Sequence, residues 1–229
     1  MNKRLKHILS YIKDGIGVID VGTDHGYLPV ELAARGYSGN ILASDINSGP
    51  LNAAKRTASV SGVSDRIQFF LCDGLEQCPP DAVDTIVIAG MGGDTICSIL
   101  DRAEWCMDRR YTLILQPMTR SEVLRYWLVY NEFQIIHEDL VNDAGEIYQL
   151  LIAHFGGETK LSDAELYTGC FESIQDHPLF AEFLCEKISR FERAVQGLRS
   201  ARIPDNSGRL EIIETILKQL LEMKNHDQR

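Results

Sequence analysis

Three aspartates each follow an apolar run in the first third of the chain, at positions where an acid can hold part of a nucleoside. Asp20 ends the run GVID, Asp45 ends NILASD, and Asp73 follows RIQFFLC. An acid about 20 residues beyond a glycine turn, such as Asp45, can accept hydrogen bonds from both ribose hydroxyls. Asp73, at the next strand end, would accept from an adenine amino group while Ile46 packs on the ring. Alone, each aspartate could instead be a helix N-cap or a turn residue, but the series is far more specific than any one of them.

The turn after Asp20 reads VGTDHGYLP, and it carries an acid where the dinucleotide-binding pattern has its middle glycine. Gly22 and Gly26 would let a ligand approach the backbone closely, although glycine-rich turns also occur without ligands. In the pattern G-x-G-x-x-G, amide groups at the helix start bind a pyrophosphate, which a carboxylate at Asp24 would repel. Asp24 would suit an ammonium group, and S-adenosylmethionine carries an ammonium and a sulfonium but no phosphate. The charge pattern therefore favours S-adenosylmethionine over NAD, with His25 as a cofactor contact or a structural hydrogen-bonding residue.

The stretches AGMGG and QPM follow two further apolar runs and would lie where a transferred methyl group meets its acceptor. Amino-group methyltransferases often carry an Asp/Asn-Pro-Pro-aromatic loop at the first of these places, and this chain has AGMGG instead. Its backbone would offer carbonyls to an adenine and leave room for it. The alternative is a plain loop that ends in Asp94 as a helix N-cap. Gln116 would hydrogen-bond a base edge or be a satisfied loop amide.

The elements that position these residues alternate between short apolar runs and helix-like stretches over residues 17–155. Near-continuous Val, Ile and Leu runs are typical of parallel strands covered on both faces. The last two runs, FQIIHEDLV and GEIYQLLIAHF, are joined only by NDAG, and so short a link permits only an antiparallel hairpin. The pattern predicts a Rossmann-like α/β sheet of parallel strands with a terminal antiparallel hairpin, which is not the usual layout of a dinucleotide dehydrogenase.

The chain from residue 158 to 229 has a helical pattern, and we expect it to form a second domain after a sheet domain of residues 1–157. Its apolar residues are spaced three and four apart in two runs: Leu184, Ile188, Phe191, Val195 and Leu198, then Leu210, Ile213, Leu217 and Leu220. The segment IPDNSGR between the runs holds proline, asparagine and glycine breakers. Two narrow apolar seams joined by such a turn favour a protruding antiparallel coiled-coil hairpin over a helical cap packed on the sheet.

Composition limits the location and the partners of the protein. Hydrophobic residues make up 45% of the chain, enough to fill a core, and no apolar run approaches the roughly 20 residues that span a bilayer. The six cysteines form no C-x-x-C pair, which indicates reduced thiols in a cytoplasmic protein, without disulfides or a metal site. The net charge of −10 argues weakly against nucleic-acid binding, because phosphate contacts need Lys and Arg. A local basic patch is enough, however.

Taken together, DVGTDHGYLP, AGMGG, QPM and GEIYQ, with the N-terminal pair Arg4-Leu5 and the helical tail, resemble the bacterial tRNA adenine-22 N1-methyltransferases over nearly the whole chain. The resemblance implies a class I methyltransferase fold, S-adenosylmethionine as methyl donor, S-adenosylhomocysteine as its product, and tRNA as acceptor. It implies a cofactor site lined by Arg4, Asp20, Gly22, Asp24, His25, Gly26, Asp45, Ile46, Asp73, Gly74, Ala89 and Gly90. It implies that the residues at the adenine and the reacting atoms are Asp24, Met91, Gly92, Gly93, Gln116, Glu146 and Tyr148. One departure is Thr168-Gly169-Cys170, where the family has Gly-Pro, and it affects the start of the first long helix.

The chemistry of adenine sets what such a site must do. N1 has an in-plane lone pair that can attack the sulfonium methyl directly, so positioning and in-line geometry would supply most of the rate. No general base is strictly required. A carboxylate at Asp24 or Glu146 would stabilise the cationic product ring.

Two basic groups are candidates for holding the tRNA backbone: Lys3, Arg4 and Lys6, and Lys187, Arg190, Arg193, Arg199 and Arg202. A solvated helix face with ion pairs such as Glu186–Arg190 is the alternative for the second group. Other functions stay open at this point: a methyltransferase for another RNA or a small molecule, an NAD-binding oxidoreductase, and a non-catalytic coiled-coil adaptor. The missing G-x-G-x-x-G and the terminal hairpin speak against the oxidoreductase, and the series of acids speaks against the adaptor.

Overall fold

The computed structural model describes residues 2–200 and 208–227, and the chain divides into two compact units. The sheet unit comprises Met1–His137 and Val141–Thr159, and the helical unit comprises Glu138–Leu140 and Lys160–Arg229. The strands are β1 (Val18–Val21), β2 (Ile41–Asp45), β3 (Ile67–Leu71), β4 (Thr85–Gly92), β5 (Thr112–Thr119), β6 (Phe133–Asp143) and β7 (Glu146–Phe155). The helices of the sheet unit are α1 (Lys3–Leu9), α2 (Tyr27–Ala34), α3 (Ser48–Val60), α4 (Gly93–Asp101) and α5 (Ser121–Tyr130).

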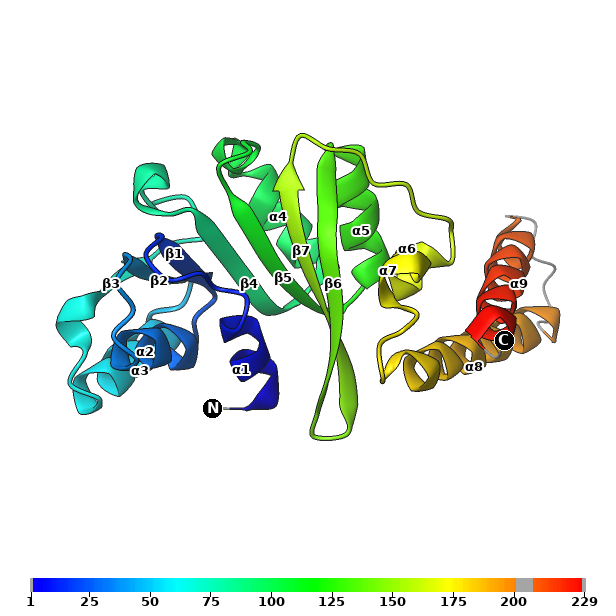
Figure 1. Ribbon diagram of the computed structural model, residues 1–229, viewed down its shortest axis with the longest axis horizontal. Helices are drawn as coiled ribbons and strands as arrows, with labels where there is room; N and C mark the ends of the chain where they lie inside the picture. The colour runs from blue at the N-terminus through cyan, green and yellow to red at the C-terminus, as the bar shows by residue number, and fades with distance from the viewer. Residues whose placement is uncertain (1, 201–207, 228–229) are drawn as a thin grey trace. The chain divides into compact units, whose positions relative to one another are not determined.

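One sheet has the strand order β3-β2-β1-β4-β5-β7-β6 (Figure 1). Strands β1 to β5 are parallel to one another, and β7 is antiparallel to β5. Two turn residues, Ala144 (φ 55°) and Gly145 (φ 90°), connect β6 to β7. Left-handed backbone at both positions matches the twist of a two-residue hairpin. The predicted sheet of parallel strands with a terminal antiparallel hairpin is therefore confirmed.

Residues of the central strands alternate between two hydrophobic cores, one on each face of the sheet. Ile86 and Ile88 of β4 lie in one core together with Leu124 of α5. Val87, between them, lies in the other core together with Leu28 of α2. Burial on both faces explains why the strands are nearly unbroken apolar runs, and Figure 1 shows α4 and α5 on the side of the strands opposite α2 and α3.

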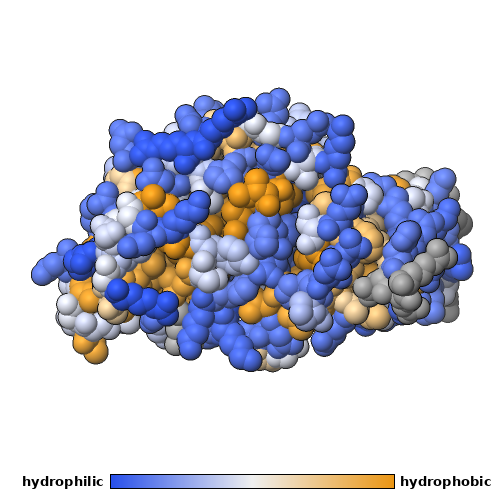
Figure 2. All heavy atoms as spheres, viewed as in Figure 1, coloured by the Kyte–Doolittle hydropathy of each residue, from blue (hydrophilic) through white to orange (hydrophobic). Residues whose placement is uncertain are grey.

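The surface in Figure 2 is largely hydrophilic, with separate hydrophobic patches. Among the large apolar side chains, Ile46 is 60% exposed and Leu71 is 50% exposed, and both lie where strands of the sheet end. In the part of the chain that the structure describes, no helix is long and apolar enough to cross a bilayer.

The stretch AGMGG is not a loop. Strand β4 continues to Gly92 and pairs with β5 through two register shifts, and Gly90 has a left-handed backbone with φ 82°. Helix α4 follows at once with Gly92 as its N-cap, so Asp94 lies in the first turn and the alternative that made it the cap is wrong. Gly93 allows this direct connection, because a Cβ there would lie 2.1 Å from the carbonyl oxygen of Arg120.

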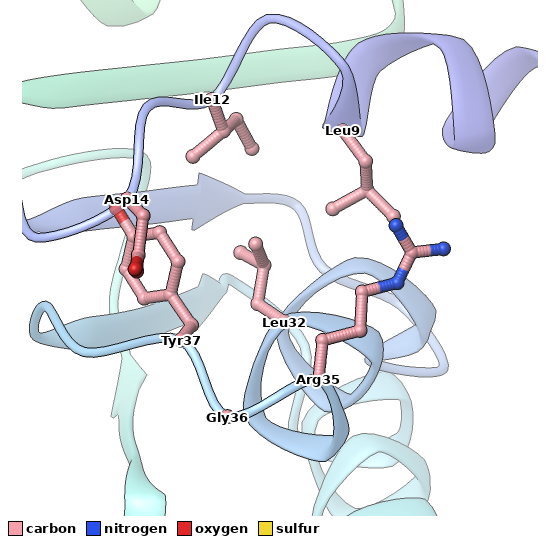
Figure 3. Close-up of a pocket in the computed structure, with 7 residues that line it drawn as sticks. All are labelled: Leu9, Ile12, Asp14, Leu32, Arg35, Gly36 and Tyr37. Atoms are coloured by element: carbon pink, nitrogen blue, oxygen red, sulfur yellow. The ribbon is translucent and has the colours of Figure 1, made fainter.

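The edge of the sheet where β1 to β5 begin, here called the amino edge, contains a cavity of about 200 Å³ (Figure 3). Its apolar lining comes from Leu9, Ile12 and Leu32. The polar groups that line it are bonded within the protein: Asp14 accepts from the backbone N–H of Ser38 (2.8 Å), Arg35 pairs with Glu31 (2.8 Å), and the hydroxyl of Tyr37 donates to the carbonyl of Lys13 (2.9 Å).

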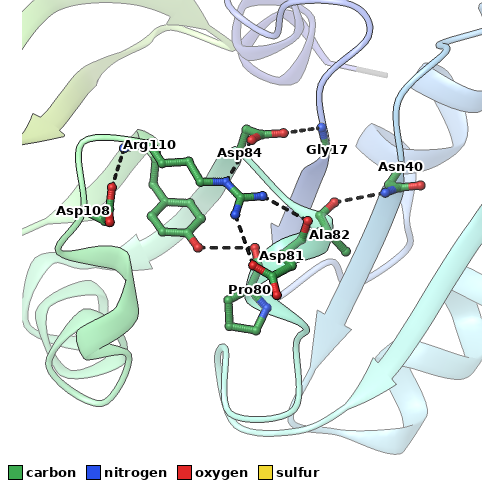
Figure 4. Close-up of polar contacts among 9 residues, drawn as sticks. Gly17, Asn40, Pro80, Asp81, Ala82, Asp84, Asp108 and Arg110 are labelled. Carbon is green, nitrogen blue, oxygen red and sulfur yellow. Dashed lines mark hydrogen bonds and ion pairs between the residues drawn. The ribbon is translucent and has the colours of Figure 1, made fainter.

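A second network braces the amino edge between β4 and β5 (Figure 4). Nε of Arg110 donates to Asp84 (3.2 Å), and its Nη1 donates to Asp81 (3.2 Å). The other carboxylate oxygen of Asp84 accepts from the backbone N–H of Gly17 (3.0 Å), just before β1. These carboxylates raise the pKa of Arg110, and the hydrogen bond to Asp84 is the largest cause. Asp84 therefore joins the segments that precede β1, β4 and β5.

The helical unit contains α6 (Glu165–Thr168), α7 (Phe171–Ile174), α8 (Phe180–Arg199) and α9 (Arg209–Asp227). Helices α8 and α9 pack together as predicted, and Arg199 of α8 pairs with Glu214 near the start of α9 (2.7 Å). The apolar seam of α8 is as expected, except that Leu198 is only half-buried. On α9 the buried residues are Ile216, Leu220 and Met223. Leu220 is buried as expected, and Leu210, Ile213 and Leu217 are half-buried, so the buried stripe of α9 lies to one side of the predicted seam. Thr168 of α6 contacts the sulfur of Met223 (3.9 Å).

The departure at Thr168-Gly169-Cys170 has a local cause. Gly169 has φ 94°, and a Cβ there would lie 2.7 Å from Oε2 of Glu138. The same oxygen accepts from the backbone N–H of Cys170 (2.7 Å), just before α7. A glycine between α6 and α7 thus lets the chain close on Glu138, which belongs to the helical unit.

Candidate functional site

The turn between β1 and α2 lies at the opposite, carboxyl edge of the sheet and has three left-handed residues. Gly22 (φ 70°), Asp24 (φ 51°) and Gly26 (φ 71°) alternate along it. A Cβ at Gly26 would lie 2.9 Å from Cβ of Ala54 in α3, so this glycine allows two helices to approach. A Cβ at Gly22 would lie 2.0 Å from Cε of Met91, so the Met91 side chain, which comes from β4, covers the turn. Packing within the chain therefore explains part of the glycine pattern.

Asp20 is buried beneath this turn, only 7% exposed. One of its oxygens accepts from the hydroxyl of Thr23 (2.7 Å). Burial raises the pKa of Asp20 to about 6; the bond from Thr23 opposes the rise, and the charge of Asp45 adds to it. Thr23 had no role in the sequence prediction, although its place three residues after an aspartate is typical of a side chain that braces a turn.

Asp45 ties the same turn to the end of β2. Its Oδ2 accepts from the backbone N–H of Asp24 (3.2 Å), and its Oδ1 accepts from that of Asn47 (2.8 Å). A carboxylate has about four lone-pair positions, so these two bonds leave capacity on both oxygens. Ile46, the next residue, is exposed beside it.

Asp73 follows β3 and is half-exposed, with one oxygen 2.7 Å from Nη2 of Arg102. Arg102 also lies 3.8 Å from Glu76. The sequence prediction missed Arg102, because it comes 29 residues after Asp73 and no spacing rule links them. Gly74 has φ 59°, and a Cβ there would lie 2.8 Å from Ile99.

Asp24 and His25 stand at the surface of the turn. Nε2 of His25 lies 3.7 Å from Oδ2 of Asp24, and 68% of the Asp24 side chain is exposed. The ring of His25 stacks on that of Tyr27 at 5.4 Å between centroids. Asp24 is therefore a carboxylate open to solvent, while His25 is held by an aromatic neighbour.

The predicted acceptor residues lie along β4, β5 and β7. Ala89 is the register partner of Gln116, and Met91 is that of Pro117. Glu146, the first residue of β7, is exposed, and Tyr148 is half-buried two residues later.

Gln116 agrees with the second of its two predicted roles, an amide satisfied within the protein, and not with a base contact. Its side chain is fully buried, its Oε1 accepts from Nη1 of Arg4, and its Nε2 donates to the carbonyl of Pro117 (3.0 Å). The Arg4 guanidinium carbon lies 5.4 Å from the ring centre of Tyr148. The structure thus brings Arg4, Gln116 and Tyr148 together, apart from the acids of β1 to β3.

The basic residues proposed for RNA have varied surroundings. Lys3 and Lys6 are exposed on α1, and Arg190 is exposed on α8. In the described part of α8, Glu186 and Arg190 form no ion pair, so this example of the alternative is wrong, although both side chains are exposed as on a solvated helix face. Lys187 lies 4.6 Å from the ring centre of Phe183. Nε of Arg193 donates to the carbonyl of Ser189 (3.2 Å), and Arg199 pairs with Glu214. Arg202 lies outside the described residues.

Titratable side chains do not gather into a metal-binding group. Within residues 2–200 and 208–227, no cluster of three or more His, Cys, Asp or Glu side chains has the arrangement that would hold a metal ion.

Comparison with known proteins gives one consistent family. Residues 1–151 match the family described as a methyltransferase domain. The chain is 28% identical to the Bacillus subtilis protein named tRNA (adenine(22)-N(1))-methyltransferase, over 99% of this chain and 98% of that one. The crystal structure of B. subtilis TrmK, an M1A22 tRNA methyltransferase, has a TM-score of 0.87 and 27% identity, covering 98% of each chain. Streptococcus pneumoniae Sp1610, in a complex with S-adenosyl-L-methionine, has a TM-score of 0.84 and 31% identity, covering 98% of this chain and 99% of that one. The chain belongs to the TrmK family of tRNA (adenine-22-N1)-methyltransferases, within the class I methyltransferase fold.

Proposed function

We propose that this protein transfers the methyl group of S-adenosylmethionine to N1 of adenine 22 in tRNA, as the name of its B. subtilis relative states. The observation that carries the proposal is the series of acids on three adjacent strands. Asp20, Asp45 and Asp73 follow one another along the carboxyl edge at β1, β2 and β3. Ligands bind at this edge in open α/β sheets.

The donor set fits S-adenosylmethionine. Asp45 keeps hydrogen-bonding capacity for two ribose hydroxyls after its two backbone bonds. Ile46 offers an exposed apolar surface for a base, and Asp73 keeps an oxygen beyond the one that meets Arg102. Asp24 is an exposed carboxylate at the turn, where it would attract an ammonium group and repel a pyrophosphate. The same arrangement therefore disfavours NAD.

In the mechanism, S-adenosylmethionine supplies an electrophilic methyl group, and this chain supplies positioning and charge. Asp45 and Asp73 hold the nucleoside, and Met91 of β4 covers Gly22 in the turn between β1 and α2. Adenine N1 needs no general base for the attack, so orientation is the main contribution of the protein. An exposed carboxylate, Asp24 or Glu146, stabilises the positive charge that develops on the ring. His25 is a contact residue in this scheme and takes no part in the transfer.

Methyl transfer from labelled S-adenosylmethionine to unmodified tRNA tests the function. Wild-type enzyme should label a transcript with adenine at position 22 and leave unlabelled a transcript in which that adenine is replaced by guanine. Mapping the labelled nucleotide separates this activity from one on another RNA. Label on ribosomal RNA, on protein, or on nothing would contradict the proposal.

The tRNA backbone would contact Lys3 and Lys6 of α1 and the basic face of α8. Reversing the charge of Arg190 and Arg193, which form no ion pair in the described part of α8, should weaken tRNA binding. Each lost phosphate contact should flatten the slope of log Kd against log salt by about one unit. An unchanged affinity and slope would exclude the α8 patch.

A further inference from the structure

The guanidinium of Arg4 lies on the half of the carboxyl edge formed by β4, β5 and β7. Its Nη1 donates to Oε1 of Gln116 and lies 3.6 Å from the sulfur of Met118. Its Cζ is 5.4 Å from the ring centre of Tyr148, and a Cβ on Gly90 would be 3.3 Å from Nη1. All four neighbours are uncharged. The acids that suit the cofactor are on the other half, at the ends of β1, β2 and β3.

The charge of Arg4 has no carboxylate partner within residues 2–200 and 208–227. The nearest carboxylate contact is made by its backbone N–H, which donates to Asp143 (3.5 Å). Arg102 and Arg110, by contrast, each pair with an aspartate. A guanidinium has five N–H donors in a planar fork that matches a phosphate or carboxylate. Most of these donors are unused by the protein, so Arg4 has the means to bind an anion.

Gln116 fixes where that guanidinium lies. Its Nε2 donates to the carbonyl of Pro117, so its Oε1 must point to Arg4. If the amide turned over, its NH₂ group would face the guanidinium and its oxygen would face the Pro117 carbonyl, and both hydrogen bonds would be lost. Because Gln116 is fully buried, this orientation is protected from solvent. Tyr148 supports the same guanidinium by a cation–π contact.

We infer that Arg4 binds the phosphate of the nucleotide whose adenine is methylated, and that Gln116 and Tyr148 are positioning residues for this contact. The inference rests on the proposed function. The carboxylate of S-adenosylmethionine has the same anionic chemistry, but the place of Arg4 on β4, β5 and β7 favours the acceptor. A phosphate would also neutralise the positive charge of Arg4. Without it, that charge would repel the positively charged ring of the methylated adenine.

Three enzymes test the contact: wild type, Arg4→Gln and, as a matched control, Arg35→Gln. Arg35 is an arginine of the same unit that pairs with Glu31 at the amino edge. Methyl transfer to the tRNA transcript is measured at several salt concentrations, and Kd for S-adenosylmethionine by calorimetry. Arg4→Gln should raise KM for tRNA about tenfold and flatten the slope of log KM against log salt by about one unit. Kd for S-adenosylmethionine should stay unchanged, and Arg35→Gln should resemble wild type.

Gln116→Glu gives a second readout without a change of side-chain shape. The new carboxylate would pair with Arg4 and neutralise it, so KM for tRNA should rise as it does in Arg4→Gln. Equal melting temperatures of Arg4→Gln and wild type would exclude misfolding as the cause.

A raised Kd for S-adenosylmethionine with an unchanged salt slope would assign the anion to the cofactor and overturn the inference. An Arg4→Gln enzyme that behaves like Arg35→Gln would overturn it too. If the wild-type enzyme transfers no methyl group, the proposed function fails instead. Titration of the same variants with the tRNA transcript would then still measure the salt slope and decide whether Arg4 binds a phosphate.

Discussion

The two edges of the sheet use similar polar side chains in opposite ways. At the amino edge, Asp84 bonds both Gly17 and Arg110, and the groups around the cavity are paired within the protein. At the carboxyl edge, Asp24 is exposed, and Arg4 has only uncharged side-chain neighbours. Hydrogen-bonding capacity that is used within the chain stabilises the fold, whereas capacity that is left over can bind a ligand. This contrast separates structural from functional residues more clearly than residue type does.

The largest effect should come from Asp45→Asn. The change removes the charge that holds two backbone groups and would hold the ribose hydroxyls, so Kd for S-adenosylhomocysteine should rise about 100-fold or more, since each hydrogen bond to a charged group contributes about 1.5–3 kcal/mol. Calorimetric titration measures this. Asp84→Asn is the same substitution at the amino edge and should leave Kd unchanged. Similar affinities for the two variants would remove the functional distinction between the edges.

The next effect is a pH dependence of stability that arises from the buried Asp20 at the carboxyl edge. The pKa of Asp20 is about 6 in the folded protein, against 3.8 for an aspartate in an ordinary solvated environment. Between these values the native state binds more protons than the unfolded state, so the contribution of Asp20 to stability falls as pH rises from about 4 to 6. The total loss is on the order of 3 kcal/mol.

Asp20→Asn should remove this loss while keeping an acceptor for Thr23. The unfolding free energy of Asp20→Asn minus that of wild type, both measured by denaturant titration, should therefore increase as pH rises from about 4 to 7. Parallel pH profiles for the variant and wild type would show that burial at this edge has no cost in stability.

The sequence predicted the elements and the acids better than it predicted their surroundings. Strand ends, the hairpin and the series of aspartates follow from local patterns: apolar runs, a short link, and acids at their ends. The sequence left open whether Gln116 contacts a base or is satisfied within the protein, because its hydrogen-bond partner Arg4 is 112 residues away in sequence. Arg102 was missed for the same reason. Contacts between distant segments decide which polar groups are already paired, and no spacing within one segment records that.

The glycines illustrate the same limit. Their pattern at the β1–α2 turn and in AGMGG suggested room for a ligand. At Gly26 and Gly93, however, the missing Cβ makes room for Ala54 and for the carbonyl of Arg120. A sequence shows that the backbone must come close to something at such a position, but the tertiary structure is needed to show what.

A smaller effect is expected for Asp84→Ala, which should act on stability alone. It leaves the N–H of Gly17 and Nε of Arg110 without their acceptor, while the Nη groups of Arg110 keep Asp81, and loss of such bonds costs about 1–2 kcal/mol. Unfolding by denaturant should show this decrease, while kcat and both KM values stay those of wild type at a temperature where the variant is folded. A fall in kcat with unchanged stability would mean that the amino edge also serves the reaction.

The smallest effect should come from Ile46→Ser. This side chain is 60% exposed, so its removal should hardly change the melting temperature. A base that packs on it would bury part of its apolar surface, worth about 1 kcal/mol, and Kd for S-adenosylhomocysteine should rise roughly fivefold. Val60→Ser is the matched control, because Val60 is 90% exposed at the end of α3. If both variants bind the cofactor product equally well, the exposed apolar surface at the carboxyl edge is ordinary surface; if only Ile46→Ser binds it more weakly, exposure at this edge marks unused binding capacity for apolar as well as polar groups.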